Sequence, residues 1–157
     1  MRLALYQPDI PQNTGTILRL AACLGLGVDV IGPAGFDMSD RNLRRAGMDY
    51  LAHVEVVRHV DFAAFEAVRT ATGRRLVLLT TSAATSYLDQ MFDPADTLLL
   101  GRESAGVPDH VRAAVDIAVR IPLAPGLRSL NIAVAAAMVA GEALRQTGGF
   151  PLSRAPA

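Results

Sequence analysis

Short apolar runs recur along this chain, and most of them are continuous rather than alternating. They are rich in leucine and β-branched residues and lie at Leu3–Tyr6, Val28–Ile31, Val54–Val57, Leu76–Thr80, Thr97–Leu100 and Ile117–Ile121. Continuous runs of this length are typical of parallel strands whose two faces are both covered. The runs therefore predict a mostly parallel β-sheet at the centre of the fold.

Segments with helical periodicity separate these runs. They lie at Thr16–Leu24, Ser39–Ala46, Asp61–Thr72, Pro108–Val115 and Ser129–Gln146. Several begin with a capping residue or a proline and end beside a glycine, as helices commonly do. The alternation of strands and helices predicts an α/β fold with helices on both faces of the sheet. The 157 residues, 51% of them apolar, favour a single domain over residues 1–147, with residues 148–157 as a tail.

The charge balance limits the partners that such a chain can bind. Basic and acidic residues number 15 each, so contact with a nucleic acid would require a local basic patch. Every basic residue is an arginine, which excludes lysine chemistry such as a Schiff base. The lone cysteine, Cys23, excludes an internal disulfide and is expected in the core. No cluster of Cys and His has the spacing of a metal site, so no metal is expected.

The chain carries no sequence signal for a membrane or for export. Strand-like sequence begins at Arg2, which argues against a signal peptide. The longest charge-free apolar stretch, between Arg128 and Glu142, is too short to span a membrane. These observations predict a cytoplasmic protein.

Three segments combine small and polar residues beside apolar runs. They are Pro11–Arg19, Gly101–Pro108 and Ile121–Asn131, the last of which leads into an almost purely apolar helix. Each follows a predicted strand, and ligands bind beyond the carboxyl ends of parallel strands. The three segments therefore predict one composite site. The absence of a Gly-x-Gly-x-x-Gly turn and of a Walker loop argues against a dinucleotide or a P-loop nucleotide as its ligand.

Several residues of these segments also have simpler interpretations. Gly101–Pro108 is consistent with an ordinary strand-to-helix turn, in which Glu103 caps the helix or forms a local ion pair. Arg19 is consistent with a side chain that extends to the surface, and Asn13 with a turn or capping residue. The histidines are scattered, show no nucleophile spacing and are expected on the surface: His53, His59 and His110.

Three arginines fall on one face of a predicted helix. Arg41, Arg44 and Arg45 are spaced i, i+3 and i+4. The face is either solvated or a docking patch for phosphates, which the guanidinium group fits well.

Taken together, the three segments resemble the signatures of the SPOUT class of RNA methyltransferases, specifically its SpoU branch of ribose 2′-O-methyltransferases. The matching stretches are Pro11–Gly15 with Arg19, Leu98–Pro108 and Ile121–Ala135. The short chain and the segment Gly35–Tyr50 are similar to the subfamily of tRNA (cytidine/uridine-34)-2′-O-methyltransferases. Arg102, where a Pro or small residue is frequent, departs from the pattern, as does the pair Ile132-Ala133.

The resemblance implies a C-terminal trefoil knot, a homodimer, S-adenosylmethionine as cofactor and the tRNA anticodon stem-loop as substrate. It implies that the cofactor lies bent in the knot, with contacts from these residues: Leu79, Gly101, Glu103, Ile121, Ser129 and Leu130. It also implies a catalytic group of Arg19, Asn13, Ser129 and Asn131. Because a guanidinium is a very poor base, we expect Arg19 to act as an electrostatic clamp on the reacting ribose and its phosphate. We expect Arg41, Arg44 and Arg45 to contact RNA.

Other functions are compatible with parts of this pattern. A knotted RNA-binding protein without catalysis would keep the fold, and a ribose methyltransferase acting at another tRNA or rRNA site would keep the motifs. A small-molecule α/β enzyme is a third alternative, although the chain lacks a phosphate loop, a metal cluster and a nucleophile. The expected activity is methylation of the wobble ribose, at nucleotide 34 of tRNA.

Overall fold

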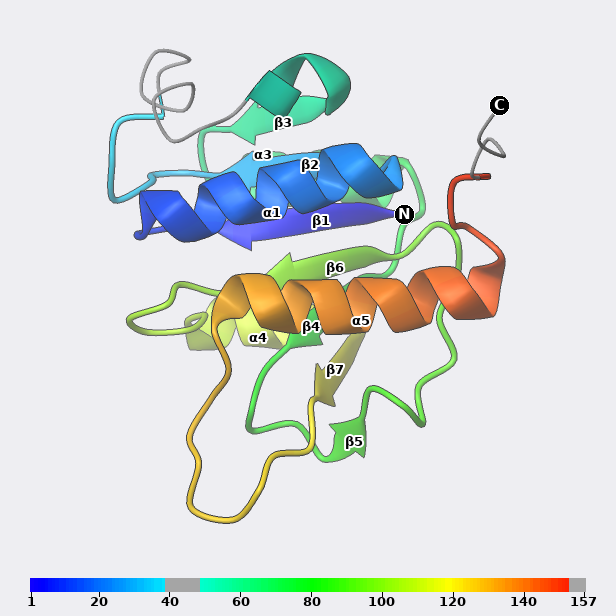
Figure 1. Cartoon of the computed structure of the whole chain (residues 1–157). Coiled ribbons are helices and arrows are strands. Elements are labelled where there is room, and N and C mark those ends of the chain that lie inside the picture. The colour runs from blue at the N-terminus through cyan, green and yellow to red at the C-terminus, as the bar shows by residue number, and fades with distance from the viewer. Residues whose placement is uncertain (39–48, 153–157) are drawn as a thin grey trace.

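The computed structural model describes residues 1–38 and 49–152 (Figure 1). Its strands are β1 (Arg2–Tyr6), β2 (Gly27–Ile31), β3 (Val56–His59), β4 (Leu76–Leu79), β5 (Thr85–Ser86), β6 (Thr97–Leu100) and β7 (Ile117–Arg120). Its helices are α1 (Pro11–Leu24), the 3-10 helix η1 (Asp49–His53), α3 (Phe62–Ala71), α4 (Asp109–Ala114) and α5 (Ile132–Thr147). The predicted helix Ser39–Ala46 lies outside the described residues.

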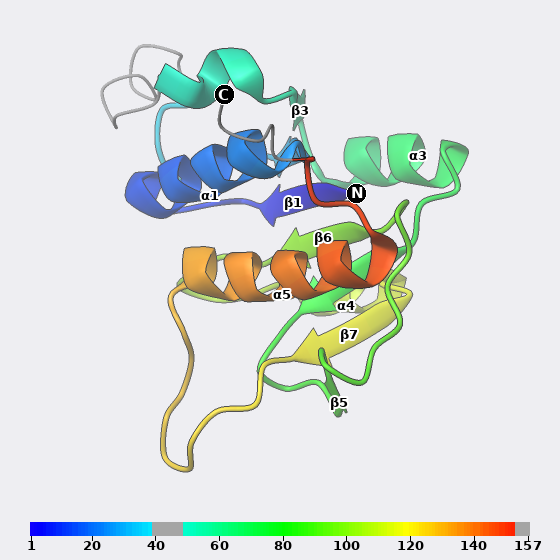
Figure 2. The ribbon, with the colours of Figure 1, turned by 45° about the vertical axis from the view of Figure 1, so that its right-hand side comes forward.

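The strands form one parallel sheet in the order β3-β2-β1-β6-β4-β7-β5. Successive residues of β1 show why both faces are apolar: Leu3 and Leu5 belong to one core cluster, and Ala4 and Tyr6 belong to the other. Helices α1 and α5 cover the first face, and α3 and α4 cover the second (Figure 2). The continuous apolar runs are thus explained by burial on both sides, and the predicted α/β fold is confirmed.

Helix α1 begins earlier than the sequence pattern predicts. Pro11 occupies its first turn, where a proline needs no hydrogen-bond acceptor and its ring fixes a helical φ. The amide of Thr14 already donates to the carbonyl of Ile10. The prediction that Asn13 is a turn or capping residue is therefore wrong, because Asn13 lies inside the first turn of the helix. This places its side chain on a rigid element.

Strand β3 lies two residues beyond its predicted position, because a buried polar residue at its end, His59, pairs with Asp29 on the neighbouring strand. His59 is buried, and its Nε2 lies 2.8 Å from Oδ1 of Asp29 on β2. The other carboxylate oxygen of Asp29 accepts a 2.6 Å hydrogen bond from Arg2. The prediction that His59 is a surface residue is wrong for this reason. A polar pair between neighbouring strands is not visible in the apolar pattern of either strand.

One further expectation about burial is wrong. Cys23 is exposed, because Ile17, Leu18 and Ala21 form the buried face of α1 and Cys23 lies on the other side of the helix.

The two-residue strand β5 was not predicted; it pairs with β7 at the edge of the sheet. None of the helices in the described part of the chain has the length and apolarity needed to cross a bilayer.

Candidate functional site

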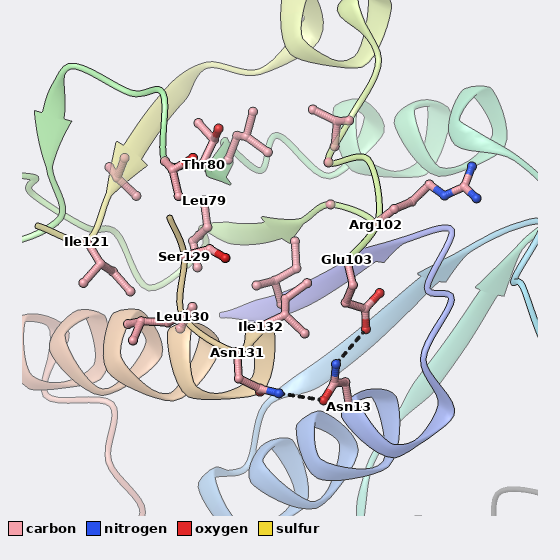
Figure 3. Close-up of a pocket in the computed structure, with 18 of the residues that line it drawn as sticks. Asn13, Leu79, Thr80, Arg102, Glu103, Ile121, Ser129, Leu130, Asn131 and Ile132 are labelled. Carbon is pink, nitrogen blue, oxygen red and sulfur yellow. Dashed lines mark hydrogen bonds between the residues drawn. The ribbon is translucent and has the colours of Figure 1, made fainter. Parts of the chain in front are cut away.

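A pocket of about 470 Å³ opens at the carboxyl ends of β4, β6 and β7 (Figure 3). Residues of all three predicted segments line it, together with the end of β4. The lining consists of Ile10, Asn13, Leu78, Leu79, Thr80, Thr81, Leu100, Gly101, Arg102, Glu103, Gly106, Val107, Arg112, Val119, Ile121, Leu123, Ser129, Leu130, Asn131, Ile132 and Ala135. Its volume is within the range of about 300–1,000 Å³ that small-molecule sites occupy.

A chain of hydrogen bonds joins the three segments at one side of the pocket. Asn131 caps α5, because its Oδ1 accepts from the amides of Ala133 and Val134. Its Nδ2 donates to Oδ1 of Asn13 over 2.9 Å, and Nδ2 of Asn13 donates to Oε1 of Glu103 over 3.2 Å (Figure 3). These bonds fix the orientation of both amides. The start of α1, the loop after β6 and the start of α5 are therefore held in one arrangement.

Glu103 extends this network to Asp9 in the loop before α1. Its Oε2 accepts from the backbone amide of Asp9, and its own amide donates to Oδ1 of Asp9. The hydroxyl of Ser104 donates to the other carboxylate oxygen of Asp9. Burial raises the pKa of the Glu103 carboxyl, and the neighbouring Asp9 side chain adds to the increase. Burial therefore disfavours the ionised form of the Glu103 carboxyl, and a positive charge bound beside it would stabilise that form.

The pKa of Asp9 shifts in the opposite direction. Its interaction with the Glu103 side chain lowers it to about 2, and the hydrogen bond from Ser104 contributes in the same direction. A carboxyl whose pKa is lower in the folded than in the unfolded chain stabilises the folded state above its ordinary pKa. That contribution is lost as the pH falls toward the folded value.

We therefore expect the replacement Asp9→Asn to have a pH-dependent effect on stability. The difference in free energy of unfolding between wild type and Asp9→Asn should shrink as the pH falls from about pH 4 toward pH 2. Urea unfolding across this range measures it. Asp109→Asn, which changes an exposed carboxylate in the first turn of α4, is the control. An Asp9→Asn difference that does not change with pH would contradict the assignment.

Gly101 and Gly106 form a tight turn at the floor of the pocket. The amides of Arg102 and Gly106 each donate to the other residue's carbonyl, over 2.9 and 2.8 Å. A Cβ atom on Gly101 would lie 2.7 Å from the carbonyl carbon of Gly106, so only glycine fits there. Gly106 itself has a φ of 65°, which glycine adopts without strain. At Gly101 and Gly106 the turn presents backbone to the pocket.

The structure brings together all but one of the residues predicted to bind the cofactor or to act in catalysis. Those that line the pocket are Asn13, Leu79, Gly101, Glu103, Ile121, Ser129, Leu130 and Asn131. Arg19 does not line it: it is exposed and six residues beyond Asn13, about 9 Å further along α1. The predicted RNA-binding residues Arg41, Arg44 and Arg45 lie outside the described residues.

Sequence reasoning missed the side of the pocket formed after β4 and by α4. Thr80 lies directly after β4, and its hydroxyl is 3.1 Å from that of Ser82. Arg112 on α4 donates to the Ser82 hydroxyl over 2.8 Å. The rule that ligands bind beyond the carboxyl ends of strands would have indicated Thr80, whereas nothing in the sequence pattern indicated Arg112.

The lining combines apolar side chains with one carboxyl group and with the guanidinium groups of Arg102 and Arg112. Leu79, Leu100, Ile121 and Leu130 supply apolar walls, and Glu103 supplies a carboxyl group at the opposite end (Figure 3). This combination fits S-adenosylmethionine, which carries an adenine ring and a sulfonium centre. Among the described residues, no group of three or more His, Cys, Asp and Glu side chains has the arrangement of a metal site.

Comparison with known proteins gives the same assignment as the motifs. The sequence model of the SpoU rRNA Methylase family matches residues 1–141. A tRNA (cytidine(34)-2′-O)-methyltransferase of Beijerinckia indica is 65% identical over 148 residues, which cover 94% of this chain and 92% of that protein. The protein of the same name from Escherichia coli K12 is 38% identical over 150 residues, 94% of each chain.

Solved structures agree with these sequence matches. One, described as giving structural insights into the 2-OH methylation of C/U34 on tRNA, superposes with a TM-score of 0.86 at 42% identity, over 92% of this chain and 94% of that one. The SpoU methyltransferase AviRb from Streptomyces viridochromogenes, solved with AdoMet, superposes with a TM-score of 0.82 at 32% identity, over 93% of this chain and 60% of that one. Motifs, fold and sequence matches together show that this chain belongs to the SpoU methylase family.

Proposed function

We propose that the protein transfers a methyl group from S-adenosylmethionine to the 2′-hydroxyl of the wobble nucleotide, cytidine or uridine 34, in tRNA. The observation that carries the proposal is the pocket in which Asn13, Glu103 and Asn131 join three distant segments of the chain. Relatives that match nearly the whole chain and carry the name tRNA (cytidine(34)-2′-O)-methyltransferase support the substrate. We further propose that residues 1–147 are one catalytic domain that acts in the cytoplasm.

The chain's own residues bind and orient the reactants. When bound, S-adenosylmethionine supplies an activated methyl group on a positively charged sulfur. We assign cofactor contacts to Leu79, Gly101, Ile121 and Leu130, and we assign the stabilisation of positive charge to Glu103. Because the methyl group is already activated, holding the 2′-hydroxyl in line with it can supply much of the rate acceleration.

Polar groups at the mouth of the pocket act on the ribose. In this proposal Ser129 and Asn131 orient the 2′-hydroxyl, and Asn13 holds Asn131 in place. Arg19 stabilises the negative charge that develops on the 2′-oxygen and binds the adjacent phosphate. Its guanidinium is a clamp rather than a proton acceptor, because it does not give up its proton in proteins.

Methyl transfer to defined tRNAs tests the function. The purified protein is incubated with tritium-labelled S-adenosylmethionine and unmodified tRNA, and the product is mapped by nucleoside mass spectrometry. We expect one methyl group at nucleotide 34. The matched control is the same tRNA with a 2′-deoxyribose at that nucleotide, which has no acceptor hydroxyl. Methylation at another nucleotide would reassign the substrate, and RNA binding without transfer would indicate a non-catalytic protein.

We propose that Arg41, Arg44 and Arg45 bind tRNA phosphates. The double replacement Arg44→Ala with Arg45→Ala should weaken tRNA binding and flatten its dependence on salt. With fewer phosphate contacts, binding releases fewer counterions from the tRNA. Filter binding over a salt series measures both quantities. An unchanged affinity and salt slope would mean that this face is only solvated.

We also propose that the protein is a homodimer that associates through α5. Val134 and Met138 are adjacent on its outward face and are 48% and 38% exposed, which leaves an apolar stripe on the surface. Because both side chains are exposed in the single chain, they are suitable probes of association. Arg19 lies on the exposed side of the neighbouring helix α1, so a second copy there would approach it. We therefore propose that Arg19 acts on substrate held between two copies.

Replacing both Val134 and Met138 with glutamate should give a folded monomer. The charges would be tolerated on an exposed face but not in an apolar interface. Analytical ultracentrifugation at micromolar concentration should show a dimer for the wild type and a monomer for the variant, with the same circular dichroism spectrum. Val68→Glu is the control, because Val68 is an exposed residue of α3 on the other face of the sheet. A monomeric wild type would contradict the proposal.

We propose, finally, that the chain between β7 and α5 closes a trefoil knot. The support is topological: α5 packs beside α1 and over β6, whereas β7, from which it comes, lies beyond β4. The connection between β4 and β6 runs past the outer side of β7 through β5 (Figure 1). A crystallographic chain trace tests whether α5 has passed through this connection.

A further inference from the structure

Arg19 is held by an aromatic side chain from another part of the fold. Its guanidinium carbon lies 4.7 Å from the centre of the Tyr50 ring, within the range of a cation–π interaction. Its Nη2 also donates to the Tyr50 hydroxyl over 3.4 Å. Among the described residues, both of these contacts of the Arg19 side chain are with Tyr50.

The Tyr50 ring is a fixed platform rather than a loose surface group. Tyr50 is the second residue of η1, the short teal helix at the top of Figure 1, which packs against α1. Leu51 and Val54, which follow it, pack on the same core cluster as the inner face of α1. Tyr50 itself is half-buried. The backbone on both sides of the Arg19–Tyr50 contact is thus anchored to one core.

The chemistry of the contact differs from that of the ion-paired arginines in the fold. Arg2, Arg75 and Arg145 each bind a carboxylate at 2.6 to 2.8 Å. A carboxylate neutralises the charge it holds, whereas an aromatic ring orients a guanidinium and leaves its charge and most of its N–H groups available. Arg19 is therefore oriented without being neutralised. This is the state that a group needs if it is to bind a phosphate or a developing oxyanion.

We propose that Tyr50 is a positioning residue for Arg19 in methyl transfer. It restricts the long arginine side chain to one orientation before the substrate binds. Less conformational entropy of that side chain is then lost when the substrate binds. The inference rests on the proposed role of Arg19 in catalysis. It also assigns a function to the last residue of the segment Gly35–Tyr50, none of whose described residues lines the pocket.

Two replacements separate the ring from the hydroxyl. Tyr50→Leu removes the ring and should lower kcat roughly ten-fold, because a displaced catalytic group loses its orientation. The KM for tRNA and the affinity for S-adenosylhomocysteine should change less than about two-fold. Tyr50→Phe keeps the ring and should retain kcat within about two-fold, since the lost hydrogen bond is long. His53→Leu, a change of an exposed side chain at the end of the same helix, is the control and should leave kcat unchanged.

A double-replacement cycle makes the test specific. In the Arg19→Ala background, Tyr50→Leu should cause no further loss of kcat, because nothing remains to be oriented. The positioning role is overturned if Tyr50→Leu keeps wild-type kcat, if Tyr50→Phe loses as much as Tyr50→Leu, or if the two losses multiply. Circular dichroism identifies a variant that has lost kcat through misfolding. If Tyr50→Leu misfolds, Tyr50→Met, which also removes the ring but fills more of its volume, takes its place with the same expected results. If Arg19→Ala itself turns over normally, the proposed role of Arg19 fails instead.

Discussion

Arg19→Ala is expected to lower the rate of methyl transfer at saturating tRNA by about a hundred-fold or more, as removal of a charge that stabilises a transition state typically does. Affinity for S-adenosylhomocysteine should stay within about two-fold, because Arg19 does not line the pocket. Single-turnover kinetics measure the first quantity, and calorimetry measures the second. The separation of the two effects is the signature of a group that acts on the ribose and not on the cofactor.

Two variants serve as controls for this result. Arg74→Ala removes an arginine outside the pocket, whose described contact is a hydrogen bond to the carbonyl of Ala95, and it should leave turnover unchanged. Arg19→Lys keeps a positive charge but loses the planar fork of donors, so it should recover only part of the rate. Normal turnover by Arg19→Ala at saturating tRNA would remove Arg19 from the mechanism.

Gly101→Ala is expected to weaken cofactor binding strongly. The new methyl group would lie 2.7 Å from a backbone carbon of Gly106, and the paired hydrogen bonds of the turn prevent that backbone from moving away. Overpacking of this kind destabilises a fold by about 1–3 kcal/mol. Because the strained backbone is the pocket floor, affinity for S-adenosylhomocysteine should fall at least about ten-fold, which calorimetry measures.

Gly141→Ala is the matched control for Gly101→Ala. No atom lies within 4 Å of the position that its Cβ would take, and the residue is inside α5. Alanine should therefore stabilise the helix by about 0.5–1 kcal/mol and leave the cofactor affinity unchanged. Wild-type affinity in Gly101→Ala would show that the turn adapts and that the pocket floor is not fixed by glycine.

Mixing the Arg19→Ala and Gly101→Ala proteins tests whether the site is shared between two copies. If Arg19 of one copy serves the pocket of the other, a mixed dimer has one intact site and regains activity. If Arg19 serves its own pocket, every site in the mixture carries one lesion and the mixture stays inactive. The recovered fraction should follow the fraction of mixed dimers.

The position of the pocket could be predicted from the sequence because it depends on local signals. Continuous apolar runs locate β4, β6 and β7, and the small and polar residues just beyond them locate the pocket lining. Parallel pairing then brings those ends together without further information. The grouping of Gly101 and Ser129 follows from this rule alone, although their roles came from the family resemblance.

Features that depend on pairing between distant residues could not be predicted in this way. The burial of the His59 side chain depends on its contact with Asp29, a residue that is thirty positions away in the chain. The orientation of Asn13 depends on Glu103 and Asn131, and without those partners its sequence context indicates only a turn. Arg19 was grouped with Asn13 because both belong to one motif, but on a helix six residues lead to a different face.

The bond between Asn131 and Asn13 has a consequence for synthesis in the cell. It joins residues 118 positions apart, and the pocket wall also includes Ile132 and Ala135 of the last helix. A nascent chain still attached to the ribosome before α5 has emerged therefore has no complete pocket, whatever part of its sheet has formed. Cofactor can stabilise only the finished polypeptide, since a ligand favours only the states that bind it. Cofactor level would then influence how long completed chains survive, and would leave the early steps of folding unassisted.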